Sequence, residues 1–206
     1  MAGTASRAGR GTYRGDIVAG SLLLRESRQI ARLLLKDPGK ESWDEAILAG
    51  NILQKRSPVT ARREARLIQG RLRLLTPEAW EAISSGTAEV ATQFLLAAAI
   101  KHSRLLGDFM DQVVREQHRT FQKDLPNKEW DKFLETCKQS DPSIEDWKPS
   151  TVKKLRQVIF RILAEAKYIE STRSRRLLPV RVVPQVKDYL VSHNEEYVLR
   201  CMEVAQ

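Results

Sequence analysis

Hydrophobic residues recur at three- and four-residue spacings through most of this chain, and the pattern predicts a mainly α-helical fold. The apolar–polar alternation that is typical of strands is scarce before residue 168. The most hydrophobic part, residues 88–121, is expected to form the centre of the core. The periodic segments predict a short helix from residue 42, two helices within 88–121, and further helices over 26–36, 60–75, 77–86, 128–138, 143–147 and 151–167.

Residues that favour helix ends divide these segments. Thr60 is expected to cap the helix that follows it, and Thr76 followed by Pro77 is typical of a helix start. Pro126 disfavours helix in the residue before it, so we place a hinge and a domain boundary there. The sequence therefore predicts a flexible basic tail, a helical domain and a second domain, over residues 1–16, 17–125 and 127–206.

The second predicted domain contains a long amphipathic helix over 151–167, with Ser150 as its expected cap. At 100° per residue its apolar and polar residues fall on opposite faces. The apolar face comprises Val152, Leu155, Ile159, Ile162, Leu163 and Ala166, and the polar face comprises Lys153, Lys154, Gln157 and Arg161. A β-hairpin with an arginine-rich tip is expected over 168–183. Helix, short helix, long helix and hairpin follow one another in the order of a winged helix-turn-helix.

The positive charge of the chain is concentrated in this same region. Residues 148–187 contain eleven Lys or Arg and two acids, a surplus equal to the net charge of +9 of the whole chain. Such a local surplus is typical of proteins that bind nucleic acid. Gln157 and Arg161 are candidates for contacts to base edges, whereas the residues suited to phosphates are Lys153, Lys154, Arg173, Arg175 and Arg176. The alternative is that these charges form only the solvated face of an amphipathic helix.

A second basic stripe is expected on the helix predicted over 60–75. Arg62, Arg66, Gln69 and Arg73 fall within about 60° of one another on a helical wheel. They are candidates for a second nucleic-acid contact. The alternative is a structural role in which these arginines pair with acids elsewhere in the chain.

The sequence contains no recognisable catalytic arrangement. The three histidines, His102, His118 and His193, lie in unrelated settings, and no phosphate-binding glycine loop is present. Asp108 and Asp111 have a spacing that could serve a metal, but such a pair usually faces solvent or an arginine. We therefore expect no enzyme activity, no cofactor and no metal.

Two further features concern the cellular compartment. Cys137 and Cys201 match no metal or redox spacing and are expected to be incidental thiols in a reducing compartment. The longest apolar run, over 94–100, is far shorter than the roughly 20 residues that cross a bilayer. We expect a cytoplasmic protein without a membrane span or signal peptide.

Four segments of this chain resemble the BrxA family, a component of bacterial BREX phage-exclusion systems. They are IVAGSLLL at 17–24, NILQKRS at 51–57, IKHSRLLGDF at 100–109 and STVKKLRQVIFRILAEA at 150–166. The resemblance implies a NusB-like helical N-terminal region, a winged-helix C-terminal region, and binding to double-stranded DNA with little sequence preference. It also implies a role in a multi-protein defence locus, and it transfers no catalytic residues.

Three functions are compatible with these observations. The first is a non-enzymatic accessory protein that binds double-stranded DNA, and the second is an RNA-binding protein of the antitermination type. RNA recognition usually requires aromatic residues that stack on bases, and only 6% of this chain is aromatic, which favours duplex DNA. The third is a scaffold whose basic surface binds an acidic partner, such as another BREX protein.

Overall fold

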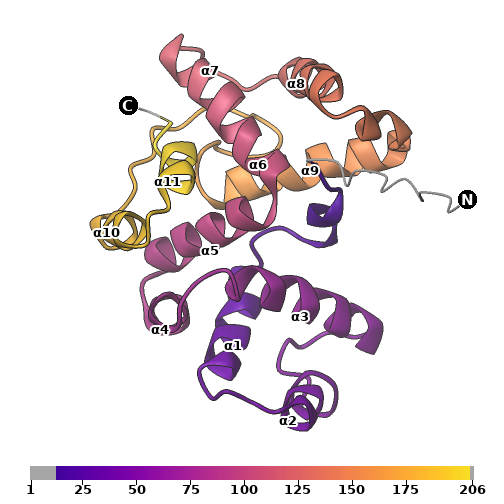
Figure 1. The fold of residues 1–206 in the computed structure, drawn as a ribbon, viewed down its shortest axis with the longest axis vertical. Helices are drawn as coiled ribbons and strands as arrows, with labels where there is room; N and C mark the ends of the chain where they lie inside the picture. The colour runs from indigo at the N-terminus through magenta and orange to yellow at the C-terminus, as the bar shows by residue number, and fades with distance from the viewer. Residues whose placement is uncertain (1–12, 205–206) are drawn as a thin grey trace, which may run out of the picture.

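The computed structural model describes residues 13–204, and the fold is mainly helical, as the sequence predicts (Figure 1). The elements of the first half are η1 (Asp16–Ala19), α1 (Leu24–Leu34), α2 (Lys40–Asp44), η2 (Glu45–Ala49), α3 (Pro58–Leu72), α4 (Pro77–Ser85) and α5 (Ala88–His102). Those that follow are α6 (Arg104–Asp108), η3 (Phe109–Val114), α7 (Arg115–Arg119), α8 (Asn127–Ser140), η4 (Pro142–Asp146), α9 (Pro149–Glu165), α10 (Pro184–Ser192) and α11 (Glu196–Met202).

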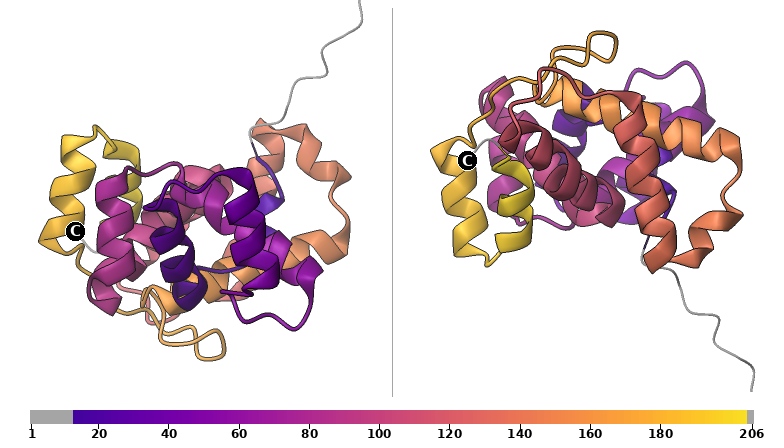
Figure 2. Two further views of the ribbon diagram at one scale, coloured as in Figure 1. Left: turned by 90° about the horizontal axis from the view of Figure 1, so that it is seen from below. Right: turned by 90° about the horizontal axis from the view of Figure 1, so that it is seen from above.

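The helix α5 lies at the centre of the fold and is buried on nearly all sides. Residues 93–100 are all buried, because 94–100 are apolar around the whole circumference of the helix and the amide of Gln93 is hydrogen-bonded. It contacts α1, α3 and α4 on one side and α6, α10 and α11 on others (Figures 1 and 2). The break predicted near His102 is confirmed, since Ser103 leaves the helical conformation and caps α6. The predicted hydrophobic centre is therefore correct.

The core extends without interruption across the predicted domain boundary. The ring of Phe109 in η3 lies 5.5 Å from that of Trp130 and 5.3 Å from that of Phe133, both in α8. Its centroid also lies 6.0 Å from that of Phe160 in α9. One cluster of buried side chains thus joins both segments, and the division into 17–125 and 127–206 stays a prediction.

Several helices begin at proline rather than at the predicted caps. Thr76 and Pro77 do start α4, but α3 begins at Pro58, which leaves Thr60 inside its first turn. Likewise α9 begins at Pro149, one residue before Ser150. Proline is favoured at the first helical position because its fixed φ suits the helix and its missing N–H would have no partner there.

The predicted hairpin is present only as a turn. Within residues 13–204 no strand forms. An isolated bridge of Ile169 with Leu177 closes the turn, and a second bridge, of Arg176 with Asp124, links it to the segment before α8. Beyond the turn, the side chain of Gln93 in α5 accepts a hydrogen bond from Val183 N and donates one to Arg181 O. Residues 179–183 therefore lie against α5 instead of pairing with a second strand.

A buried carboxylate connects the two ends of the described chain. Asp108 is 4% exposed and accepts hydrogen bonds from the hydroxyls of Tyr13 and Tyr197, at 2.9 and 2.7 Å, and from Arg104 Nε at 2.9 Å. A Cβ at Gly107 would lie 2.3 Å from the Tyr197 hydroxyl, so this approach requires glycine. Burial, and then hydrogen bonding that includes Asp108, raises the pKa of both phenols, so that the protonated, donating form persists to more alkaline pH than in an ordinary tyrosine.

The tail predicted over 1–16 lies largely outside the described residues, which begin at Tyr13. Its last part is attached to the core, because Tyr13 N donates to Asp141 and the Tyr13 hydroxyl to Asp108. Among the helices of the described part of the chain, none is long and apolar enough to cross a bilayer.

We predict that Tyr197→Phe lowers the free energy of unfolding by about 2 kcal/mol, because a hydrogen bond to a buried charge is lost. Tyr189→Phe is the matched comparison. It removes the same hydroxyl, whose partners Thr76 N and Thr76 Oγ1 are uncharged, and is expected to cost about 1 kcal/mol. Urea unfolding followed by circular dichroism measures both. If both variants lose the same free energy of unfolding, the hydrogen bond to Asp108 does not stabilise the fold more than one to an uncharged partner.

We also predict that both thiols react slowly in the folded protein. Burial raises the pKa of Cys137 to about 11 and that of Cys201 to about 12, so that little thiolate exists at neutral pH. Titration with a disulfide reagent should label both cysteines in urea and neither rapidly in buffer. Rapid labelling of either cysteine in the folded protein would show that its thiol is accessible to solvent and not buried.

Candidate nucleic-acid interface

The polar face of α9 is exposed in full, as the sequence predicts. Leu155, Ile159 and Ile162 are completely buried and hold the helix against the core. The four residues of the opposite face are exposed, and we refer to them as the α9 surface: Lys153, Lys154, Gln157 and Arg161.

The turn after α9 brings two further arginines to this surface. Arg173 and Arg175 lie with Gln157 and Arg161 around one hollow of about 510 Å³, which we call the α9 hollow. Arg175 has a left-handed backbone with φ of 55°, and its carbonyl accepts from Leu125 N at 2.9 Å. This turn is therefore held in place by the segment before α8. The rest of the lining consists of Asn127, Arg156, Phe160 and Thr172.

The cations of the α9 surface keep their charge available for a ligand. Among the side chains that the structure describes, no carboxylate forms an ion pair with Lys153, Lys154, Arg161, Arg173 or Arg175. Of the two acids within the basic segment, Glu165 accepts hydrogen bonds from Ser21 Oγ and Leu22 N, at 2.7 and 2.8 Å. The other, Glu170, pairs with Arg176. Arg176 is thus the predicted phosphate contact whose charge is already partly neutralised.

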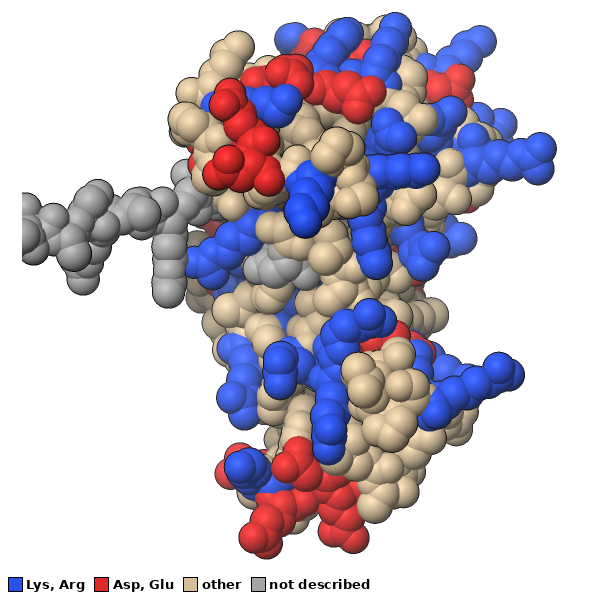
Figure 3. Space-filling view, turned by 90° about the vertical axis from the view of Figure 1, so that its right-hand side faces the viewer, with Lys and Arg blue, Asp and Glu red and all other residues tan. Residues whose placement is uncertain are grey.

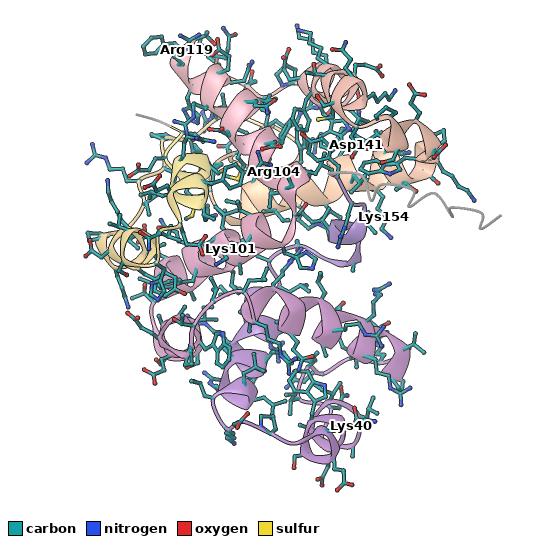
Figure 4. All side chains as sticks on the ribbon, viewed as in Figure 1. Lys40, Lys101, Arg104, Arg119, Asp141 and Lys154 are labelled. Atoms are coloured by element: carbon teal, nitrogen blue, oxygen red, sulfur yellow. The ribbon has the colours of Figure 1, made fainter. Side chains whose placement is uncertain are left out.

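The predicted contacts of α9 do not all face the same way. Lys153 lines a different hollow, between α8, η4 and α9, together with Trp147 and Arg156. Figure 4 shows Lys154 beside η1, on the side of α9 that faces α3. Only Gln157 and Arg161 of the α9 surface lie within the α9 hollow.

The basic stripe on α3 is exposed, but its residues line two separate hollows. Arg62 and Arg66 line a hollow of about 540 Å³ next to η1 and the end of α5. Arg63, which the sequence analysis did not select, lies there as well. Arg73 is about 16 Å from Arg62 along the helix axis and lines a different hollow with Trp43 and Trp80. We call Arg62, Arg63 and Arg66 the α3 surface.

The two basic surfaces are visible from one side of the molecule. Figure 3 shows a hollowed middle region with Lys and Arg side chains on both of its borders, and acidic side chains mainly toward the two ends. Gly15, just before η1, lies next to the start of α9, since a Cβ placed there would be 3.8 Å from the side chain of Thr151. The alternative that the α3 stripe pairs with acids is not observed for Arg62, Arg66 or Arg73 among the described side chains.

One arginine of α3 has a structural role that the sequence analysis missed. Arg71 is buried and donates to the carbonyls of Gly20 and Ser21, which ties α3 to the segment between η1 and α1. Its position four residues after Leu67, on the apolar face of the helix, was the available signal. The basic residues of α3 thus have different roles. Arg71, on the apolar face, stabilises the fold, whereas the arginines of the α3 surface lie on the exposed face.

Both carboxylates considered for metal binding, Asp108 and Asp111, have structural partners. Asp111 accepts from Arg115 and Arg200, in line with the arginine contact expected for such a carboxylate. Desolvation lowers the pKa of His118. Within the described residues no group of three or more potential ligands is placed to hold a metal ion.

Comparison with known proteins identifies relatives along nearly the whole chain. A BREX protein BrxA of Paramagnetospirillum magneticum (strain ATCC 700264 / AMB-1) is 48% identical over 193 residues, which cover 94% of this chain and 97% of that protein. A BREX protein BrxA of Escherichia coli O9:H4 (strain HS) is 35% identical over 189 residues, or 92% of this chain and 89% of that protein.

The fold also matches a solved structure. The crystal structure of an uncharacterized protein from Magnetospirillum magneticum superimposes with a TM-score of 0.87 at 46% identity, covering 93% of this chain and 98% of that one. The sequence model of the BrxA family matches residues 11–194, and with the relatives above it shows that this chain belongs to the BrxA family.

Proposed function

We propose that this chain is a non-enzymatic accessory protein of a bacterial BREX phage-defence system, and that it binds double-stranded DNA largely through backbone phosphates. Its relatives are named as BREX proteins. The observation that supports DNA binding most strongly is a set of five cations on α9 and the following turn that have no carboxylate partner among the described side chains: Lys153, Lys154, Arg161, Arg173 and Arg175. Cationic side chains that neutralise DNA phosphates release the condensed counterions, and this release provides a large share of the affinity for a duplex.

The arrangement of α8, η4, α9 and the turn suggests how a duplex would be held. We propose a winged-helix geometry in which α9 lies in the major groove, so that Gln157 and Arg161 reach base edges. Arg173 and Arg175, on the turn that replaces the wing, would contact the adjacent phosphates. We also propose that residues 17–125 form a NusB-like domain and 127–206 a separate DNA-binding domain. This role places the protein in the cytoplasm, where it would meet other BREX proteins.

The α3 surface would extend the same contact. The α3 surface lines a hollow that includes Ala19 of η1, and Figure 4 shows Lys154 beside η1, so a phosphate strand that passes η1 would meet cations from both helices. Arg73 lies outside this region. We therefore assign the duplex contact of α3 to Arg62 and Arg66.

We predict that Lys154→Glu combined with Arg161→Glu reduces the dependence of duplex affinity on salt. Each phosphate contact contributes a slope of about 0.9 in log affinity against log salt, so two lost contacts reduce it by about 1.8. Fluorescence anisotropy with labelled duplex at several salt concentrations gives the slope. Lys36→Glu with Lys132→Glu, which makes the same change in net charge at exposed sites outside the α9 surface and the α3 surface, is the control.

Two results would contradict the proposed function. An unchanged slope in the α9 variant, or a slope near zero for the unaltered protein, would favour the protein scaffold. Tighter binding of single-stranded RNA than of duplex to the α9 surface would favour the RNA-binding function.

We predict that Arg62→Ala with Arg66→Ala also lowers the salt slope by about 1.8, whereas Arg73→Ala leaves it unchanged. The three residues are exposed on one helix, which makes Arg73→Ala the matched control. The same anisotropy titration tests both variants. If the two variants behave alike, α3 and α9 do not border a common duplex site.

A further inference from the structure

A hollow at the far end of α3 has no role in the proposed duplex contact. It has a volume of about 410 Å³ and lies between the start of α2, the C-terminal end of α3 and α4. We call it the Trp43 hollow, and its lining consists of Leu34, Asp37, Pro38, Lys40, Trp43, Gln69, Arg73 and Trp80. Figure 4 shows Lys40 at one end of the molecule and Lys154 near its middle. The hollow is therefore distinct from the α9 surface.

The two tryptophans provide flat apolar surface that is only partly covered. Both are half-buried and pack against the core from its edge. The indole N–H of Trp80 donates to Leu72 O at 2.7 Å, which fixes that ring and satisfies its polar atom. Among the aromatic pairs of residues 13–204, neither indole stacks on another ring. Both rings therefore present part of their apolar surface to the hollow, where a planar ligand could contact them.

The polar groups around these rings are of two kinds. Lys40 and Arg73 are exposed, and no carboxylate among the described side chains forms an ion pair with either. They are suited to an anion such as phosphate. Asp37 and the amide of Gln69 can accept hydrogen bonds from amino groups of a planar ring system. The hollow thus combines the groups that bind a base with those that bind its phosphate.

We propose that the Trp43 hollow binds one unpaired nucleotide, with its base against Trp43 and Trp80 and its phosphate at Lys40 and Arg73. Pockets of roughly 300 to 1,000 Å³ are the usual size for small ligands, and this hollow is within that range. Stacking on aromatic side chains is the general means by which proteins hold unpaired bases. The ligand is either a free mononucleotide or an unpaired nucleotide of a strand, which share this chemistry.

An unpaired base is favoured over a duplex by the shape and composition of the site. Bases within a duplex are stacked on each other and present only their edges, so a pocket with aromatic faces has nothing to bind there. The α9 hollow has the opposite composition, since Phe160, its one aromatic lining residue, is 4% exposed. The two hollows therefore suit different forms of nucleic acid.

Tryptophan fluorescence tests this proposal directly. We expect adenosine monophosphate and a short single-stranded oligoadenylate to quench the emission of the full chain to saturation, while inorganic phosphate does not. Arg73→Glu should weaken binding at least about tenfold, as expected for a lost charge-assisted contact of phosphate. Lys128→Glu, an exposed charge reversal on α8, should bind as the unaltered protein does. Tighter binding of the oligonucleotide than of the mononucleotide identifies a strand as the ligand, and equal binding identifies the free nucleotide.

A second variant guards against loss of folding. Trp43→Ala should weaken binding roughly 5- to 150-fold through lost stacking, and thermal unfolding followed by circular dichroism reports whether the chain remains folded. Trp43→Phe keeps an aromatic face and should restore part of the affinity. The proposal is overturned if no saturable quenching occurs, or if Arg73→Glu binds as tightly as Lys128→Glu. It is equally overturned if Lys154→Glu with Arg161→Glu removes the quenching, because the base would then bind at α9.

Discussion

The packing of one face of α9 against the core determines where the positive charge of this protein lies. Leu155, Ile159, Ile162 and Leu163 are all at 0% exposure. Burying such a side chain stabilises the fold by about 1.5 to 3 kcal/mol, so rotation of the helix about its axis would expose several of them at once. Because apolar and basic residues occupy opposite faces, this constraint turns the cations outward. The α9 surface is thus a consequence of the core and not of contacts among the charges.

The N-terminal part of the chain supports this arrangement through polar contacts. Glu165, at the end of α9, accepts hydrogen bonds from Ser21 and Leu22, which follow η1. Arg71 of α3 donates to the carbonyls of Gly20 and Ser21 in the same segment. A short linker therefore contacts both α3 and α9 and holds their basic surfaces in a fixed relation. The linker also binds the carboxylate of Glu165, one of the two acids of the basic segment that could otherwise neutralise the cations of α9.

Periodicity predicted the helices and the two faces of α9 because each depends on local spacing. The start of α3 was wrong by two residues, since Pro58 supplies a better first position than Thr60 does a cap. The hairpin was overestimated because Gln93, distant in sequence, binds residues 181–183. The separation of Arg73 from Arg62 and Arg66 depends on where α2 and η1 pack along α3, which no helical wheel contains. The sequence therefore predicted which basic residues are exposed, but it predicted only in part which of them line the same hollow.

Chemical footprinting of lysines reports directly whether duplex DNA contacts the α9 surface. Acetylation of the full chain, followed by mass spectrometry, reports the accessibility of each lysine with and without duplex DNA at low salt. We expect duplex to protect Lys154 strongly and Lys153 in part, while Lys36 and Lys132 remain fully reactive. Equal labelling of all four lysines, or protection confined to Lys36 and Lys132, would contradict this expectation.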